Sequence, residues 1–222
     1  ASQGDCLMPR LAKSSPTSWW ARTQVSPQNA NSGWNTVDSS SGAWQARTPL
    51  SVPGCGAPLT ADDGQVVVTI GAFERIKKVS ATGTPVWQTN SVTSPTYYGS
   101  QPLQAIAANG EITYATGSLL GRATAGGNIV FETESNRPNP RYLAVDSANN
   151  AWLVSSSGAA DGYVTKVSPG GVLQWSIAVD SPSCSDSVMA AQLIATDEML
   201  VTTQSCGEGR LFKINGSGQI AW

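Results

Sequence analysis

A ten-residue phrase recurs along this chain and limits the folds that the chain can adopt. It reads KVSATGTPVW at 78–87, KVSPGGVLQW at 166–175 and KINGSGQIAW at 213–222, and weaker copies are RATAGGNIVF at 122–131 and NTVDSSSGAW, which ends at Trp44. The aromatic residues that close the five copies follow one another at intervals of 43, 44, 44 and 47 residues. A nearly fixed period of this length indicates a repeat architecture.

The segments between the phrases repeat as well. An apolar patch such as QPLQAIAA or RYLAVDS leads into a polar turn, and a β-rich run such as EITYAT or AWLVSS follows. The phrase itself is typical of a hairpin, because its sixth residue is glycine in the four later copies and glycine adopts the positive φ that a tight turn needs. Each period of about 44 residues therefore predicts four short antiparallel strands, which is one blade of an all-β propeller.

This repeat sets the expected organisation of the chain. Because aromatic side chains bury large areas, we expect the aromatic residue of each phrase to pack between neighbouring blades; these residues are Trp44, Trp87, Phe131, Trp175 and Trp222. The ring closes either with five blades or as part of a ring of about seven or eight. The expected segments are an N-terminal tail at 1–17, initial strands or a partial blade at 18–54, and blades at about 55–92, 101–134, 141–180 and 188–222.

The phrases resemble the quinoprotein-type propeller repeat, L-x-K-V-x-x-x-G-x-x-x-W, at 75–87, 163–175 and 211–222. The segment 18–33 resembles the tryptophan-led stretch that precedes the first blade in that family, and 146–156 resembles the related D-x-x-G-N-x-W repeats. The family includes quinone-dependent alcohol dehydrogenases and non-catalytic scaffolds. The resemblance to the dehydrogenases implies adjacent cysteines with quinone and metal ligands, and this sequence has no adjacent cysteines. The resemblance therefore implies a propeller similar to the non-catalytic scaffolds, with no cofactor.

The composition excludes several classes of function. Charged residues make up 13% and the net charge is −2, so the chain has no basic footprint for nucleic acid or an anionic membrane. No run approaches the roughly 18 apolar residues of a membrane span. The sequence contains no histidine, which removes Ser-His-Asp and Cys-His catalysis and histidine metal sites. We therefore expect this chain alone not to be an enzyme.

The four cysteines point to an oxidising compartment. They lack CxxC spacing, and in a chain rich in Ser, Thr and Gly we expect disulfides rather than the alternative of free thiols in a cytosolic protein. In the blade register, Cys184 and Cys206 fall in two loops on the same face, so the preferred pairing is Cys184–Cys206 with Cys6–Cys55. The first residues, ASQGDC, resemble the start of a mature protein after signal-peptide removal, which favours a secreted or periplasmic location.

The loops on the face that carries Cys184 and Cys206 are the candidate binding site, because propellers bind ligands on loops that the rigid blades hold. Asp-rich turns at 62–64, 146–150 and 196–198 favour either calcium ligation or simple Asx turns. The candidate ligand-binding residues, chosen because Tyr and Arg are common at recognition sites and Asp and Glu bind hydroxyls, are Tyr97, Tyr98, Arg137, Arg141, Tyr142, Asp161, Asp186 and Glu208.

Two functions follow from this sequence. The first is a secreted or periplasmic recognition or scaffold module that binds protein or carbohydrate through its loop face. The alternative is one subunit of a split, proteolytically processed propeller enzyme, a hydrolase or lyase, completed by a second polypeptide. The alternative is suggested by the last phrase, which stops at Trp222, whereas residues after Trp87 and Trp175 continue the outer strand. The sequence identifies neither the ligand nor a reaction.

Overall fold

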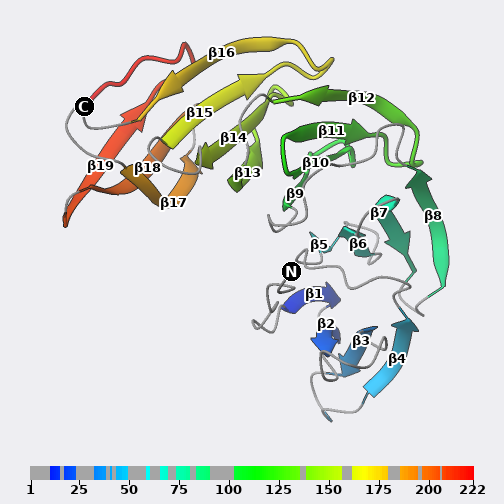
Figure 1. The fold of residues 1–222 in the computed structure, drawn as a ribbon. Coiled ribbons are helices and arrows are strands. Elements are labelled where there is room, and N and C mark those ends of the chain that lie inside the picture. The colour runs from blue at the N-terminus through cyan, green and yellow to red at the C-terminus, as the bar shows by residue number, and fades with distance from the viewer. Residues whose placement is uncertain are drawn as a thin grey trace, which may run out of the picture. The chain divides into compact units, whose positions relative to one another are not determined.

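The computed structural model consists of antiparallel sheets whose strands follow one another in chain order (Figure 1). The chain divides into two compact units, Ala1–Pro95 with Gly126–Asn128 and Thr96–Ala125 with Ile129–Trp222. The structure describes residues 11–15, 18–23, 33–38, 41, 44–49, 59–60, 66–69, 74–80, 84–90, 103–135, 139–156, 162–179, 186–194, 197–205 and 207–222.

The first unit contains two four-stranded sheets. Lys13 lies opposite Trp19 in the first strand pair, so a strand begins inside the segment 1–17 that the sequence suggested as a tail. The sequence LAKSS hides this strand because only two of its residues are apolar. The sheets are β1 (Leu11–Ser15), β2 (Ser18–Thr23), β3 (Gly33–Asp38) and β4 (Trp44–Pro49), then β5 (Leu59–Thr60), β6 (Val66–Thr69), β7 (Glu74–Val79) and β8 (Pro85–Asn90).

The second unit contains two four-stranded sheets and one three-stranded sheet. Their first strands contact one another, β9 with β13 and β13 with β17, as the innermost strands of adjacent propeller blades do. The sheets are β9 (Leu103–Ile106), β10 (Ile112–Thr116), β11 (Leu119–Ala123) and β12 (Ile129–Glu134); β13 (Pro140–Val145), β14 (Ala151–Ser156), β15 (Gly162–Val167) and β16 (Leu173–Ala178); and β17 (Asp186–Ile194), β18 (Glu198–Ser205) and β19 (Glu208–Ile214).

The turns between strands carry the glycines that the repeat predicts. Gly127, Gly171 and Gly218 each occupy the sixth position of a phrase and have φ values of 88°, 87° and 81°. This left-handed backbone is strained for residues with a side chain. The hairpin interpretation of the phrase is therefore confirmed at these three copies.

A second left-handed position recurs in the turn between the first two strands of each sheet in the second unit. Gly110, Asn149 and Asp197 occupy it, with φ values of 80°, 63° and 61°. Asparagine and aspartate tolerate this conformation better than other residues that carry a side chain. The repeat therefore preserves the backbone of this turn while the residue changes.

Apolar residues pack between neighbouring sheets of the second unit. Ala115 and Leu120 of one sheet contact Leu143 and Leu153 of the next, and Trp152 is fully buried in the following junction. Because each sheet buries side chains on both faces at these junctions, the sheets stabilise one another rather than folding around one common core. The second junction holds Trp152, Val154, Val164, Val179, Val188, Met199, Val201 and Ile214. No helix able to cross a membrane occurs among the residues that the structure describes.

Candidate functional site

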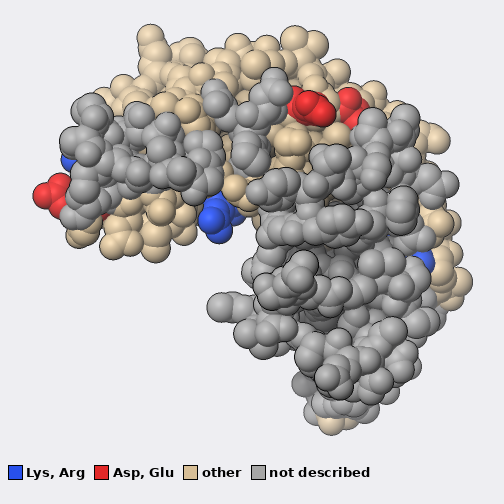
Figure 2. Space-filling view, viewed as in Figure 1, with Lys and Arg blue, Asp and Glu red and all other residues tan. Residues whose placement is uncertain are grey.

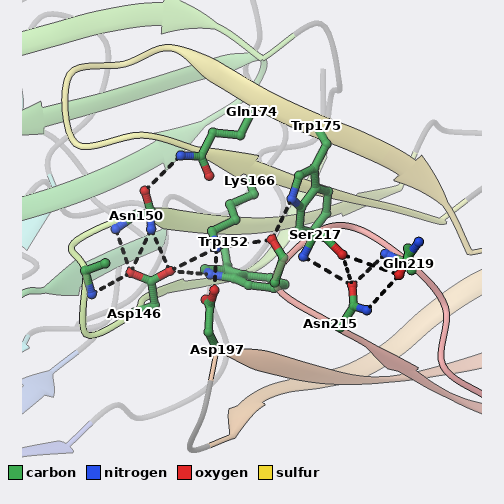
Figure 3. Close-up of polar contacts among 12 residues, drawn as sticks. Asp146, Asn150, Trp152, Lys166, Gln174, Trp175, Asp197, Asn215, Ser217 and Gln219 are labelled. Carbon is green, nitrogen blue, oxygen red and sulfur yellow. Dashed lines mark hydrogen bonds and ion pairs between the residues drawn. The ribbon is translucent and has the colours of Figure 1, made fainter.

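Asp146 directly follows β13, and its carboxylate closes the turn into β14 (Figure 3). Oδ1 accepts hydrogen bonds from the backbone amides of Ala148 at 2.9 Å and Asn150 at 2.8 Å, and Oδ2 accepts one from Nε1 of Trp152 at 3.0 Å. Burial alone would raise the pKa of Asp146, but the hydrogen bonds from Trp152 and Asn150 outweigh it and lower the pKa to about 2. Asp146 is therefore a buried, ionised turn residue at neutral pH.

Lys166 of β15 connects this turn to the next sheet. Its Nζ lies 3.4 Å from Oδ2 of Asp146, 2.7 Å from Oδ2 of Asp197 and 3.4 Å from the carbonyl oxygen of Gly216. The ammonium also lies 4.8 Å from the ring centroid of Trp152, within the range of a cation–π contact. The chain thus places its own cation beside two of the Asp-rich turns for which calcium ligation was one alternative, so a metal ion there would meet the Lys166 charge.

Arg122 performs the same task one sheet earlier. Like Lys166 it is the first residue of its phrase, and its Nη1 donates to the carbonyl oxygen of Pro169 at 3.5 Å, in the glycine turn of the next sheet. Its guanidinium lies 5.8 Å from the ring centroid of Phe131, and its Nε donates to Oγ1 of Thr113 at 2.9 Å. Burial lowers the pKa of Arg122 while the carboxylate of Glu111 opposes that shift. The cation at the head of the phrase is therefore a repeated connection between sheets.

The aromatic residue at the end of the phrase completes each connection. Nε1 of Trp175 donates to the carbonyl oxygen of Gly216 at 3.0 Å, and a Cβ on Gly218 would lie 2.7 Å from Cδ2 of Trp175. A Cβ on Gly171 would lie 2.6 Å from Cγ of Phe131. The predicted packing of the aromatic residues between sheets is confirmed for Phe131 and Trp175. These polar contacts join neighbouring sheets of the second unit.

A groove on the last sheet is the candidate binding site. Its volume is about 470 Å³, and it lies where β17 begins and β18 turns into β19. Met189 and Leu211 are 63% and 46% exposed beside it, although most large apolar side chains described in the second unit are buried or half-buried. Arg210 adds a cation, which lies 3.8 Å from the carboxylate of Glu208. The residues that line the groove are Met189, Thr202, Thr203, Gln204, Gly209, Arg210 and Leu211.

Bulges near the beginnings of β13 and β17 expose side chains at the end of the sheets where the groove lies. The pairing of β17 with β18 shifts between Val188 and Ala190, which leaves Met189 exposed. The pairing of β13 with β14 shifts in the same way between Pro140 and Tyr142, and the residue inside that bulge is the exposed Arg141. Because bulges redirect a side chain out of the regular alternation, they are common beside functional sites. Arg141 and Met189 thus occupy equivalent positions in neighbouring sheets.

The structure places some of the sequence-predicted site residues. Arg141 and Glu208 are exposed, and Glu208 lies beside the groove. Tyr142 is half-buried, and its hydroxyl accepts a hydrogen bond from the backbone amide of Leu193 at 3.1 Å, so its visible role is to join β13 to β17. The backbone of Asp186 begins β17, and nothing is described of its side chain. The predicted residues that lie outside the described part of the chain are Tyr97, Tyr98, Arg137, Asp161, Cys6, Cys55, Cys184 and Cys206.

Sequence reasoning missed the groove itself. It selected Asp186 and Glu208, which are the first residues of β17 and β19, whereas the lining residues Met189, Arg210 and Leu211 lie two or three positions further along the same strands. The disulfide pairings stay predictions, as does ligand binding by the loop residues. Across the described ranges, no group of three or more Asp, Glu or Cys side chains is arranged to hold a metal ion. On the side of the molecule that Figure 2 shows, charged side chains cover little of the described surface.

Comparisons with known proteins give the fold. No family model matches the sequence, and no curated protein matches it. Among solved structures, hydrazine synthase from Kuenenia stuttgartiensis matches with a TM-score of 0.71 at 12% identity over 100% of this chain and 68% of that one. A quinoprotein alcohol dehydrogenase-like protein from Bacteroides thetaiotaomicron matches with a TM-score of 0.62 at 14% identity over 95% and 53%. The WD40 domain of Pan2 from Neurospora crassa matches with a TM-score of 0.60 at 10% identity over 92% and 61%.

The chain has a β-propeller fold. The match to a quinoprotein-like protein agrees with the resemblance seen in the phrases, and the consecutive four-stranded sheets are its blades. BamB from Moraxella catarrhalis is also similar, with a TM-score of 0.50 at 14% identity over 93% of this chain and 72% of that one. At identities of 10–14%, these structural similarities establish the fold alone, and the function has to be argued from the residues of this propeller.

Proposed function

We propose that this propeller is a recognition or scaffold module of a secreted or periplasmic protein, which binds a protein or carbohydrate partner at its loop face. The groove on the last blade is the observation that carries the proposal. It combines the exposed thioether of Met189, the exposed side chain of Leu211 and the guanidinium of Arg210. Methionine and arginine are enriched at protein interfaces, and methionine adapts its shape to irregular partners.

Binding rather than catalysis is favoured by the roles of the ionisable groups. Asp146 is the carboxylate with a strongly lowered pKa, and its oxygens are occupied by the turn of its own blade. The buried cations Arg122 and Lys166 contact the next blade through backbone carbonyls. Perturbed groups in an active site normally face a cleft. In the described part of this chain they face blade junctions instead.

The test compares Met189→Asp with Val172→Asp. Val172 is 67% exposed, close to the 63% of Met189, but lies at a glycine turn rather than beside the groove. The wild-type protein and both variants are applied to a glycan array and cross-linked to the secreted or periplasmic proteins of the source organism. We expect one glycan class or one cross-linked partner to be lost with Met189→Asp and kept with Val172→Asp. Equal binding by both variants, or equal loss, would refute the groove as the site.

A split propeller enzyme, in which a second chain completes the ring and supplies the catalytic groups of a hydrolase or lyase, is the alternative proposal. The exposure of the last blade favours it, because Leu211 is 46% exposed whereas Val164, at the matching position of the preceding blade, is fully buried. Native mass spectrometry of the protein from its source tests this alternative. A stoichiometric second polypeptide that Leu211→Asp releases supports it, and an unaccompanied chain contradicts it.

A further inference from the structure

The glycine turn of the phrase is capped by its first turn residue in three copies. In the first unit Oγ of Ser80 accepts a hydrogen bond from the backbone amide of Thr84 at 3.0 Å. In the second unit Oγ of Ser168 accepts one from Val172 at 3.0 Å, and Oδ1 of Asn215 accepts one from Gln219 at 2.9 Å. The amide oxygen of Asn215 therefore accepts the same capping hydrogen bond that the serine hydroxyl accepts in the other two copies.

Two features set Asn215 apart from those serines. The next residue is Gly216, so no side chain shields the peptide nitrogen that follows Asn215. Its Oδ1 accepts two further hydrogen bonds, from the backbone amide of Ser217 at 3.2 Å and from Oγ of Ser217 at 2.8 Å. The bond from the Ser217 amide closes an Asx turn around the peptide that joins Asn215 to Gly216.

We propose that Asn215 is a site of spontaneous deamidation, for which its own turn supplies an oxyanion-stabilising arrangement. Water or hydroxide takes the proton of the Gly216 backbone amide, the nitrogen then attacks Cγ of Asn215, and the negative charge develops on Oδ1. The three donors that already point at Oδ1 stabilise that charge, as an oxyanion hole does. Nδ2 takes up a proton from water and leaves as ammonia, which gives a five-membered succinimide.

Water then adds to either carbonyl of the succinimide and opens the ring. The product is aspartate or isoaspartate at residue 215, so the complete reaction consumes one water molecule and releases one ammonia molecule without any change in oxidation state. The ring closure is intramolecular because Asn215 and Gly216 are adjacent, and the folded turn adds the orientation of the side chain. No enzyme or cofactor is needed.

The modification falls at a junction between blades. The carbonyl oxygen of Gly216 accepts hydrogen bonds from Trp175 at 3.0 Å and from Lys166 at 3.4 Å. Isoaspartate routes the main chain through the side-chain carbon and adds one methylene before Gly216. The carbonyl that Lys166 and Trp175 share is then displaced, so the junction between the last two blades loosens in aged protein.

Asn109, which also precedes a glycine, is the comparison site within the chain. In the part of the chain that the structure describes, its Oδ1 accepts one hydrogen bond, from the backbone amide of Glu111 at 3.1 Å. Loss of one preorganised oxyanion donor slows acyl transfer in enzymes by about 100-fold. We therefore expect deamidation at Asn215 to be at least about tenfold faster than at Asn109.

The experiment incubates the purified chain at neutral pH and follows both sites by peptide mass mapping, with isoaspartate measured by an isoaspartyl methyltransferase assay. Ser217→Ala removes the 2.8 Å donor and leaves the backbone of the turn unchanged, so we expect about tenfold slower modification at Asn215. Asn215→Ser reproduces the cap that Ser168 forms and cannot deamidate, so it should fold normally and keep its unfolding midpoint during incubation. Equal rates at Asn109 and Asn215, or no slowing in Ser217→Ala, would overturn the proposal.

Discussion

Replacing Asp146 by asparagine tests the origin of the junction's stability. Asp146 is 6% exposed, and its pKa falls from 3.8 to about 2 in the folded protein. Since one pKa unit corresponds to about 1.4 kcal/mol, the ionised form contributes about 2 kcal/mol to the free energy of unfolding. Asparagine keeps one acceptor for the turn but places an NH₂ group toward the indole of Trp152 and the ammonium of Lys166. The unpaired donors make the expected loss about 2–4 kcal/mol at neutral pH.

The pH dependence gives an independent measurement. A carboxyl with a lowered folded-state pKa stabilises the fold above its unfolded value of 3.8, and the contribution is lost as the pH falls to about 2. Urea unfolding followed by tryptophan fluorescence should therefore show a steeper loss of stability across this window in the wild type than in Asp146→Asn. Glu208→Gln, at a carboxylate whose side chain is 75% exposed, is the control and should follow the wild type. Parallel pH profiles for the wild type and Asp146→Asn would refute the reasoning.

Three further predictions concern the phrase, each measured by urea unfolding. Trp175→Phe keeps most of the ring packing but loses the indole hydrogen bond, so we expect a loss of about 1 kcal/mol. Gly171→Ala places a Cβ against the ring of Phe131 on the preceding sheet, at a residue with positive φ, and should lower the free energy of unfolding by at least about 1 kcal/mol. Gly170→Ala places its Cβ in open space and should be nearly neutral. Lys213→Ala breaks an ion pair with Glu198 in which the side chains are 27% and 26% exposed, and it should cost less than about 1 kcal/mol.

The blade architecture was predictable because its determinants are local. The phrase specifies two strands and a turn within ten residues, and the positive φ of Gly171 and Gly218 follows from that turn alone. The aromatic position recurs at nearly constant spacing, so its burial between sheets could be expected before any contact was known. The sequence did not predict the strand Leu11–Ser15, because it has neither clear alternation nor β-branched residues.

The polar connections and the groove depend on contacts that the sequence does not encode locally. Lys166 meets Asp197 after 31 residues and Gly216 after 50, so its partners emerge only when the blades are stacked. The exposure of Met189 depends on a shift in strand pairing, and the sequence of β17, in which Val188 and Met189 are both apolar, does not show which of the two faces outward. A second shift, between β13 and β14, places Arg141 in a bulge, and the sequence selected Arg141 for its chemistry and not for this position.

The hydrogen bonds between blades run in one direction, from donors on one blade to acceptors on the next, and this bears on how such a chain lengthens during evolution. At each of the two junctions in the second unit, the preceding blade supplies the donors, Arg122 or Lys166 with Trp175, and the following blade supplies the carbonyl oxygen of its glycine turn, at Pro169 or Gly216. A tandem duplication of about 44 residues copies a donating half and an accepting half together. The new copy then fits both of its neighbours without compensating mutations. Inversion or partial duplication of a blade would leave a buried cation facing another cation or an apolar surface.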